Sequence, residues 1–287
     1  MEWAPGDRSN IEDRRGIGGS GIRGVHVGLG GFVMLLIVGW LTGVNPLTLL
    51  NSGDSSPDQG AGYSGAPNSA APINSSPGEE RNVDFVDTVA NDVQDTWASV
   101  LGGRYQRTRV VLFRDAIDSA CGMAQSATGP FYCPLDEKVY LDLGFFDELS
   151  QQFGSPGDFA KAYVIAHEFG HHVQHLTGLD AGSGTGGAGA TGPGSLSVAL
   201  ELQADCFAGV WGHAASLHQS VTAGHVVVQP GDEAQALNAA AAIGDDRLQR
   251  QATGRVMPEK FTHGTSAQRV AAFRRGMESG DPAVCGR

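Results

Sequence analysis

Apolar and polar residues divide this chain into four blocks. Residues 1–23 are polar, and an uncharged apolar run, residues 25–44, follows them. A run of about 20 apolar residues is long enough to cross a bilayer, so we assign residues 24–46 to a transmembrane signal-anchor helix. Residues 47–81, rich in Ser, Gly, Pro, Ala and Asn, are typical of a disordered linker. Residues 82–287 suffice for one domain with a sizeable core.

Two spacings of apolar residues recur within this last block. Apolar residues three and four positions apart predict helices, whereas short runs rich in β-branched residues predict strands. The predicted helices cover residues 85–101, 144–153, 159–175, 197–211, 231–251 and 265–279. The predicted strands, residues 109–113 and 138–143, would form a small sheet beside the helix at 159–175. We therefore expect an α+β fold that is mostly helical.

The predicted helix at 159–175 carries the sequence His-Glu-x-x-His at His167, Glu168 and His171. Residues i and i+4 share one face of a helix, so both imidazoles can bind one Zn²⁺. Glu168 points about 100° around the helix and can reach a water on the open side of the metal. This is the arrangement of the zincin metalloproteases. The alternative is an exposed helix with coincidental histidines, which the apolar residues around the motif disfavour.

A catalytic zinc usually has a third protein ligand, and the predicted helix at 197–211 offers one. Glu201 and Asp205 are four residues apart and share a face of this helix. Glu201 can be the third ligand, and Asp205 can accept the outer N–H of a ligating His. The alternative is two solvated acids on a surface helix. Their neighbours are apolar, however, and carboxylates in such surroundings need a partner.

Three segments, residues 166–174, 201–209 and 261–269, resemble a bacterial family of neutral zinc metallopeptidases. The resemblance extends from about Asn82 to the C-terminus and implies a zincin-like domain. In the wider gluzincin group, a Glu on the helix after His-Glu-x-x-His is the third ligand, and an Asp four residues on supports a ligand His. The resemblance also implies that an edge of the sheet holds an extended substrate as an added strand.

Two further residues are candidates for the same site. The segment around His263 resembles a Thr-His segment of other membrane zincins, which implies that His263 stabilises the oxyanion; a Pro usually follows that His, whereas here Gly264 does. Arg269 could orient Asp205 or the substrate. The alternative is a helix start capped by Thr265 or a neighbouring Ser, with Arg269 on the surface.

The other histidines of the domain are not expected to hold the zinc. His172 lies about 140° from His167 around the helix and is predicted to be structural or solvated. His175 pairs in spacing with His171, but no Glu stands in the catalytic position beside that pair. The remaining ones are predicted to be surface residues: His213, His218 and His225.

The domain contains four cysteines: Cys121, Cys133, Cys206 and Cys285. An even number in an exported domain suggests disulfides. Four cysteines allow three pairings, and we favour Cys121–Cys133, which closes a short loop, and Cys206–Cys285, which ties the C-terminal tail to the helix of Glu201. No Cys-x-x-Cys pair exists, so a cysteine zinc site is disfavoured.

Charge indicates the orientation in the membrane. Four Arg precede the apolar run, and Lys and Arg are absent from residues 25–80. The positive-inside rule then places the N-terminus in the cytoplasm and the catalytic domain outside a bacterial cell membrane. A cleaved signal peptide is the alternative, although no Ala-x-Ala site follows closely. The formal net charge of −12 argues against a nucleic-acid partner.

These features predict a membrane-anchored zinc metallopeptidase that acts on peptide or protein substrates. Zn²⁺ would be held by His167, His171 and Glu201, with Glu168 as general base. A zinc amidase acting on cell-wall peptide would use the same chemistry. A membrane-tethered binding protein that keeps zinc only for stability is the third possibility, but a structural zinc site usually has four ligands and needs no base.

Overall fold

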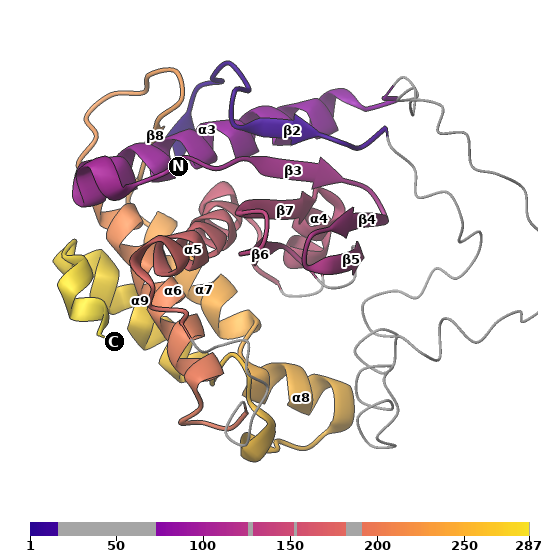
Figure 1. Cartoon of the computed structure of the whole chain (residues 1–287), viewed down its shortest axis with the longest axis vertical. Coiled ribbons are helices and arrows are strands. Elements are labelled where there is room, and N and C mark those ends of the chain that lie inside the picture. The colour runs from indigo at the N-terminus through magenta and orange to yellow at the C-terminus, as the bar shows by residue number, and fades with distance from the viewer. Residues whose placement is uncertain (17–72, 126–128, 152–153, 182–190, 287) are drawn as a thin grey trace, which may run out of the picture.

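The computed structural model describes residues 1–16, 73–125, 129–151, 154–181 and 191–286 (Figure 1). The predicted membrane helix at 24–46, most of the predicted linker and most of the glycine-rich stretch that follows the zinc motif lie outside these residues. Within the described part of the chain, no helix combines the length and apolarity that a bilayer crossing requires.

Helices dominate the described residues, and the strands are short. The helices are α3 (Pro77–Leu101), α4 (Gly144–Gln151), α5 (Asp158–Thr177), α6 (Leu196–Ser216), α7 (Asp232–Ala242), α8 (Asp245–Thr253) and α9 (Ser266–Ser279), with short 3₁₀ turns at Gly102–Arg104, Pro258–Lys260 and Pro282–Cys285. The strands are β1 (Glu2–Trp3), β2 (Ile11–Asp13), β3 (Val110–Phe113), β4 (Ala116–Ser119), β5 (Gly122–Gln125), β6 (Phe131–Cys133), β7 (Lys138–Asp142) and β8 (Val226–Val227). The prediction of a mostly helical α+β fold is confirmed.

The main sheet has four strands in the order β2-β3-β7-β6. β3 runs parallel to both β2 and β7, and β6 pairs antiparallel with β7 at the edge. All four residues of β3 are buried, as a near-continuous apolar run in a central parallel strand should be. β4 and β5 form a hairpin beside the sheet, and β1 pairs separately with β8.

Helix α5 lies at the centre of the fold, between the sheet and the other helices (Figure 1). It contacts α3, α6 and α7 as well as β6 and β7. A helix with partners on nearly every side must be apolar over most of its circumference. The residues from Phe159 through Ala166 are buried and have that character, except for the partly exposed Lys161. The two polar residues that follow, His167 and Glu168, are also buried, so the zinc motif lies inside the molecule.

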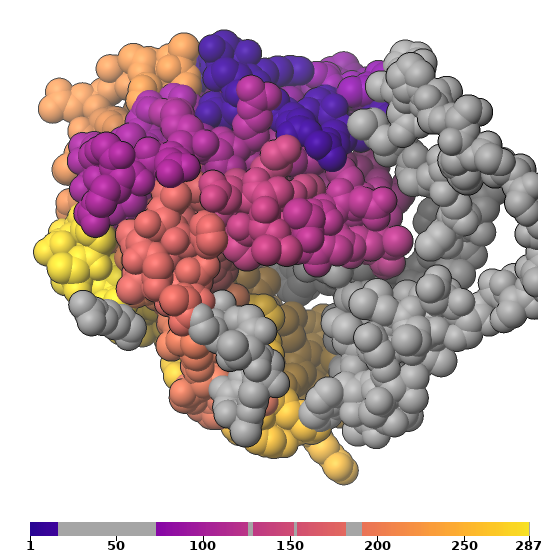
Figure 2. Space-filling model, viewed as in Figure 1, coloured from indigo at the N-terminus to yellow at the C-terminus, as the bar shows by residue number. Residues whose placement is uncertain are grey.

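The N-terminal residues belong to the folded domain, which differs from the predicted division of the chain. Residues 1–16 lie along α3 and the sheet (Figure 2). The Asp87 carboxylate on α3 accepts the backbone N–H groups of Arg8 and Asn10, each at 3.0 Å. Arg15 is buried and pairs with Glu79 and with Glu80. Composition alone could not show these partners, because they lie more than sixty residues further along the chain.

Two predicted boundaries also differ. Helix α3 starts at Pro77 rather than in the eighties, because Ser76 caps it by accepting the N–H of Glu79. The single helix predicted at 231–251 is two helices, α7 and α8, which are separated at Gly244. A Cβ on Gly244 would lie 2.3 Å from the backbone nitrogen of Ser266, so the chain turns there to let α9 begin.

Candidate functional site

Helices α5 and α6 carry the predicted zinc ligands and approach each other closely. His167, Glu168 and His171 lie on α5, and Glu201 lies on α6. A Cβ on Gly170 would lie 3.0 Å from the Cα of Ala204 on α6. A larger side chain at Gly170 would separate the helices, so this glycine lets α6 approach α5 closely.

The ligand atoms of both histidines converge on the carboxylate of Glu201. His167 Nε2 lies 3.2 Å from Glu201 Oε2, and His171 Nε2 lies 3.5 Å from Glu201 Oε1. The two imidazole rings are almost perpendicular, with centroids 4.8 Å apart. Ligand atoms of a tetrahedral zinc with bonds of about 2.0–2.1 Å are separated by roughly 3.3 Å. The separations to Glu201 therefore match the edges of such a tetrahedron.

The outer nitrogens of both rings face acceptors, which leaves each Nε2 directed at Glu201. His167 Nδ1 lies 2.8 Å from Asp205 Oδ1, and His171 Nδ1 lies 2.9 Å from Gln174 Oε1. An imidazole that donates its Nδ1–H to an oxygen keeps a lone pair on Nε2 for a metal. Asp205 occupies the supporting position that the sequence predicts, whereas Gln174 was not predicted.

Asp205 is fully buried at the centre of a hydrogen-bond network. Its Oδ1 accepts the hydroxyl of Tyr163 at 2.5 Å and Arg269 Nη2 at 2.9 Å, and its Oδ2 accepts Arg269 Nε at 2.8 Å. Burial would raise the pKa of Asp205, but Arg269 and His167 outweigh it and lower this pKa to about 2. Arg269 itself is buried on α9. The alternative of a surface Arg269 is wrong, and the expected contact with Asp205 is present.

The charges of the cluster favour a divalent cation. Three buried or half-buried carboxylates, those of Glu168, Glu201 and Asp205, surround the imidazoles with one guanidinium, that of Arg269. With neutral imidazoles, their formal charge is −2. Burial opposes a proton on His167, yet Asp205 and Glu201 raise the pKa of this histidine to about 10. The cluster therefore attracts positive charge strongly, and the two-histidine, one-carboxylate donor set suits Zn²⁺.

His263 lies in the turn before α9, and Asp245 holds this turn. Asp245 Oδ2 accepts the backbone N–H groups of Thr262, His263 and Gly264 at 2.8, 2.7 and 3.0 Å. His263 Nδ1 lies 3.2 Å from Asp245 Oδ1, and its side chain is 47% exposed. Burial lowers the pKa of His263, but the charges of Glu201 and Asp245 raise it overall. His263 is thus close enough to interact with the charge of Glu201. Thr265 caps α9, as one alternative predicted.

Three residues of this site were not found by sequence reasoning: Tyr163, Gln174 and Asp245. Tyr163 stands four residues before His167, and Gln174 stands three residues after His171, so both share the motif's face of α5. That spacing was a usable signal for these two. Asp245 offers no such signal, because it reaches the turn of His263 from a different helix.

The neighbouring histidines have structural partners. His172 is fully buried, and burial lowers its pKa. Its Nε2 lies 2.7 Å from the Gln106 carbonyl, and its Nδ1 lies 3.0 Å from the Tyr132 hydroxyl. His175 Nδ1 lies 2.8 Å from Asp180 Oδ2. Of the two predicted alternatives for His172, structural or solvated, the structure shows the structural one.

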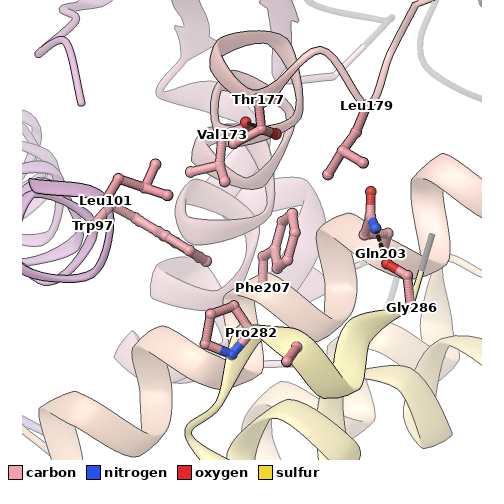
Figure 3. Close-up of a pocket in the computed structure, with 10 residues that line it drawn as sticks. Trp97, Leu101, Val173, Thr177, Leu179, Gln203, Phe207, Pro282 and Gly286 are labelled. Carbon is pink, nitrogen blue, oxygen red and sulfur yellow. Dashed lines mark hydrogen bonds between the residues drawn. The ribbon is translucent and has the colours of Figure 1, made fainter. Parts of the chain in front are cut away.

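Both predicted disulfides are present, Cys121–Cys133 and Cys206–Cys285. The second one fixes the C-terminal tail beside α6 and the zinc motif. Gln203 donates to the carbonyl of Gly286 in this tail, and Gln174 Nε2 donates to Gln203 Oε1 at 3.1 Å. Gln203 and Gly286 line a largely apolar pocket between α3, α5, α6 and the tail (Figure 3). The tail is therefore connected through two glutamines to the outer nitrogen of His171.

The chain has relatives among known proteins. The chain matches the family described as "Putative neutral zinc metallopeptidase" over residues 1–287. It is 44% identical over 299 residues to the "Uncharacterized protein YpfJ" of Escherichia coli (strain K12), covering 99% of this chain and 98% of that protein. It is 47% identical over 199 residues to the "Uncharacterized protein Rv2575" of Mycobacterium tuberculosis (strain H37Rv), covering 68% of this chain and 67% of that protein.

No solved structure matches the chain. The family match spans both the α5 motif and the α6 carboxylates, and it also includes the N-terminal residues that pack against α3. The chain therefore belongs to the "Putative neutral zinc metallopeptidase" family.

Proposed function

We propose that this protein is a zinc-dependent peptidase that hydrolyses peptide bonds, with the metal held by His167, His171 and Glu201. One observation carries the proposal. One ligand atom each from His167, His171 and Glu201 lies within 4.8 Å of the others, and each Nε2 lies 3.2 or 3.5 Å from an oxygen of Glu201. Both outer imidazole nitrogens face acceptors. Zinc bound there would lower the pKa of its water toward neutrality and polarise the scissile carbonyl.

Glu168 is the proposed general base. It follows His167 directly on α5, and it is only 7% exposed, so its carboxylate lies in a largely dry environment beside the proposed ligands. It takes a proton from the attacking water and passes that proton to the leaving nitrogen. A closed structural site would not need this group, which argues against a zinc-stabilised binding protein.

Asp205 and Arg269 are positioning residues in this proposal. Asp205 holds the tautomer and ring plane of His167, and Arg269 holds Asp205 through two hydrogen bonds. His263 is the proposed donor to the oxyanion of the substrate. Its side chain is half-exposed and Asp245 fixes its backbone, so the ring can meet a substrate without a change of fold.

The proposed place for the peptide is the edge of the sheet at β6. β6 is the outer strand of the four, runs antiparallel to β7 and contacts α5. An extended substrate can add to such an edge through main-chain hydrogen bonds, with its scissile bond alongside α5. This supports a peptide or protein substrate rather than a compact small molecule.

The test uses the full-length chain, because residues 1–16 are part of the fold. Wild type and Glu168→Gln are prepared under oxidising conditions, and bound zinc and cleavage of an unfolded protein are measured. We expect one zinc at the α5–α6 site in both, with turnover reduced by about 10²–10⁴-fold in the variant. Loss of zinc or of the fold in Glu168→Gln, or undiminished cleavage, would refute the role of Glu168. The substrate panel includes a cell-wall peptide, and cleavage of that peptide alone would identify an amidase.

Attachment to a bilayer through residues 24–46 stays a proposal from the sequence. Its support is the uncharged apolar run, which is long enough to cross a membrane. The test is fractionation of cells that express the full chain or a chain lacking residues 24–46. Extraction of the full chain by alkaline carbonate, as for a peripheral protein, would overturn the attachment.

A further inference from the structure

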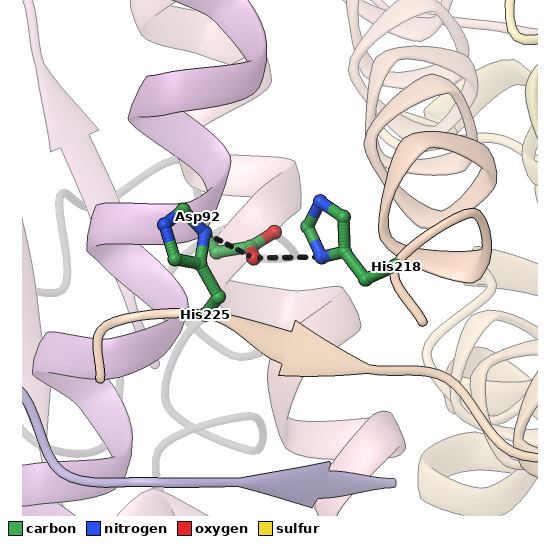
Figure 4. Close-up of side chains that lie close together, drawn as sticks. All are labelled: Asp92, His218 and His225. Carbon is green, nitrogen blue, oxygen red and sulfur yellow. Dashed lines mark hydrogen bonds and ion pairs between the residues drawn. The ribbon is translucent and has the colours of Figure 1, made fainter. Parts of the chain in front are cut away.

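We propose that Asp92, His218 and His225 form a second binding site for a divalent metal ion of the zinc type. Sequence reasoning predicted His218 and His225 to be ordinary surface residues. In the structure both rings turn inward toward the carboxylate of Asp92 (Figure 4). Among the described residues, this is the second place where three such side chains bring one ligand atom each within 4.8 Å of one another.

The three side chains come from separate elements. Asp92 lies on α3, His218 follows the end of α6, and His225 directly precedes β8 (Figure 4). Asp92 Oδ2 lies 3.2 Å from His225 Nδ1 and 3.4 Å from His218 Nδ1. These separations again match the edges of a zinc tetrahedron, which measure roughly 3.3 Å. The two rings are nearly perpendicular, as are those of His167 and His171.

The buried carboxylate needs a cation. The side chain of Asp92 is fully buried, so its carboxylate is removed from water and needs partners inside the protein. Trp211 Nε1 donates to Oδ1 at 2.7 Å and Val226 N donates to Oδ2 at 3.0 Å, so the carboxylate is fixed in place. Its ion-pair partners in the described part of the chain are two histidines, which are charged only when protonated. A bound metal ion would supply positive charge when they are neutral.

The surroundings fit a metal site. His225 Nε2 lies 3.7 Å from Asp95 Oδ2, and Arg107 holds Asp95 at 2.6 Å. A carboxylate at the outer nitrogen is the usual support of a ligating histidine. Both histidine side chains are about one-third exposed, at 32% and 34%, which gives the ion a path from solvent and room for a water as fourth ligand.

One contact sets a condition for binding. His218 Nδ1 lies 2.8 Å from the carbonyl of Val226, so a proton on Nδ1 donates to that carbonyl when no metal is bound. The metal takes the place of this proton, and Nε2 takes up a proton from solvent, so the imidazole stays neutral in its other tautomer.

The site would fasten the N-terminal strand. Val226 pairs with Trp3 of β1, and Val227 pairs with Glu2. A metal ion on Asp92, His218 and His225 joins α3 and the end of α6 to β8, and thus holds β8 in position for β1. Its role is structural, and it is separate from the proposed hydrolysis.

Metal counting on the full-length chain tests the proposal. The protein is stripped with a chelator, reloaded with zinc, and its zinc content is measured by mass spectrometry. We expect two zinc ions per chain in wild type and in the control His213→Gln, whose Nδ1 also faces a backbone carbonyl. We expect one ion in the double variant His218→Gln, His225→Gln, and one in His171→Gln. Gln keeps an amide donor for the Val226 carbonyl but is a poor zinc ligand.

The outcomes separate this proposal from the proposed function. A zinc that is lost in the double variant and retained in His171→Gln supports the second site, even if the α5–α6 site fails. One zinc in wild type that disappears only in His171→Gln overturns it. Asp95→Asn should weaken the second zinc by about 10-fold or more.

Wild-type protein provides a measurement that needs no variant. Adding zinc to the stripped protein should slow hydrogen exchange at residues 218–227, because Val226 N faces the ligated carboxylate. This result decides the question if the glutamine variants do not fold. Slower exchange at α5 with no change at 218–227 overturns the proposal.

Discussion

Asp205→Asn is expected to damage both the stability of the fold and the affinity for zinc. Asp205 Oδ1 accepts Tyr163, His167 and Arg269, and Oδ2 accepts Arg269 Nε at 2.8 Å. An Asn that keeps its oxygen at the Oδ1 position must place its NH₂ against the Arg269 Nε–H. One hydrogen bond then becomes a contact between two donors, and the buried guanidinium loses its counter-charge.

The expected size follows from the burial of the pair. Asp205 and Arg269 are 0% and 2% exposed, and removing one partner of a buried ion pair costs about 3–5 kcal/mol. For a chain of this size, that corresponds to a fall in melting temperature of roughly 6–20 °C. Loss of the carboxylate behind His167 should also weaken zinc binding by about 10–100-fold.

The assays are chemical unfolding and competition for zinc with a chromophoric chelator. The matched control is Asp180→Asn, in which a half-buried carboxylate also faces an imidazole nitrogen, at 2.8 Å from His175; it should cost less than about 1 kcal/mol. The cycle is completed by Arg269→Met and the double variant. Asp205→Asn and Arg269→Met break the same ion pair. The double variant should therefore lose much less free energy of unfolding than the two single variants lose in sum. Additive losses, or an Asp205→Asn cost no larger than the control's, would refute the reasoning.

Three further predictions test the scaffold. Gly276→Ala places a Cβ 2.0 Å from the carbonyl of Cys206, so α9 must move away from α6. We expect the free energy of unfolding in urea to fall by at least about 1–3 kcal/mol. A variant as stable as wild type would contradict this contact. Cys285→Ser opens a disulfide that spans 79 residues, and loop entropy predicts a loss of about 4–5 kcal/mol, measured by unfolding with and without reductant. Ser75, Arg15 and Arg8 lower the pKa of Glu80 from 4.5 to about 2, so the contribution of Glu80 to the attachment of residues 1–16 is complete above pH 4.5 and is lost as the pH falls toward 2. The guanidinium resonances of Arg8 and Arg15 should report the loss of these ion pairs, and resonances unchanged at pH 2 would contradict it.

The parts of the site that lie on one helix were predictable from the sequence, because helical spacing fixes them. His167 with His171 and Glu201 with Asp205 are both i, i+4 pairs, and the structure places each pair as expected. How the two helices meet depends on Gly170, which lies against Ala204 of α6, and no spacing within one helix shows which residue lies opposite.

Other features depend on contacts between distant segments and gave no local signal. Asp245 holds the turn of His263 from another helix. Arg15 is buried and forms ion pairs with Glu79 and Glu80 on α3. In the sequence it looks like part of a basic leader. His218 and His225 are polar residues in a loop, and only the packing of α3 beneath them shows that they face a buried carboxylate.

The parallel pairing of β2 with β3 has a consequence for how this chain can be sorted in a cell. Ile11 lies opposite Val110 in one sheet, so the segments before residue 17 and after residue 72 must share a compartment when the sheet forms. A stretch that crossed a bilayer once between them would put the two strands on opposite sides. A chain attached to the bilayer by one crossing of residues 24–46, as proposed above, would therefore form its domain without β2 in the sheet. Reporter domains fused to the two ends distinguish the two cases, because they face opposite sides of the membrane after one crossing and the same side when β2 pairs with β3.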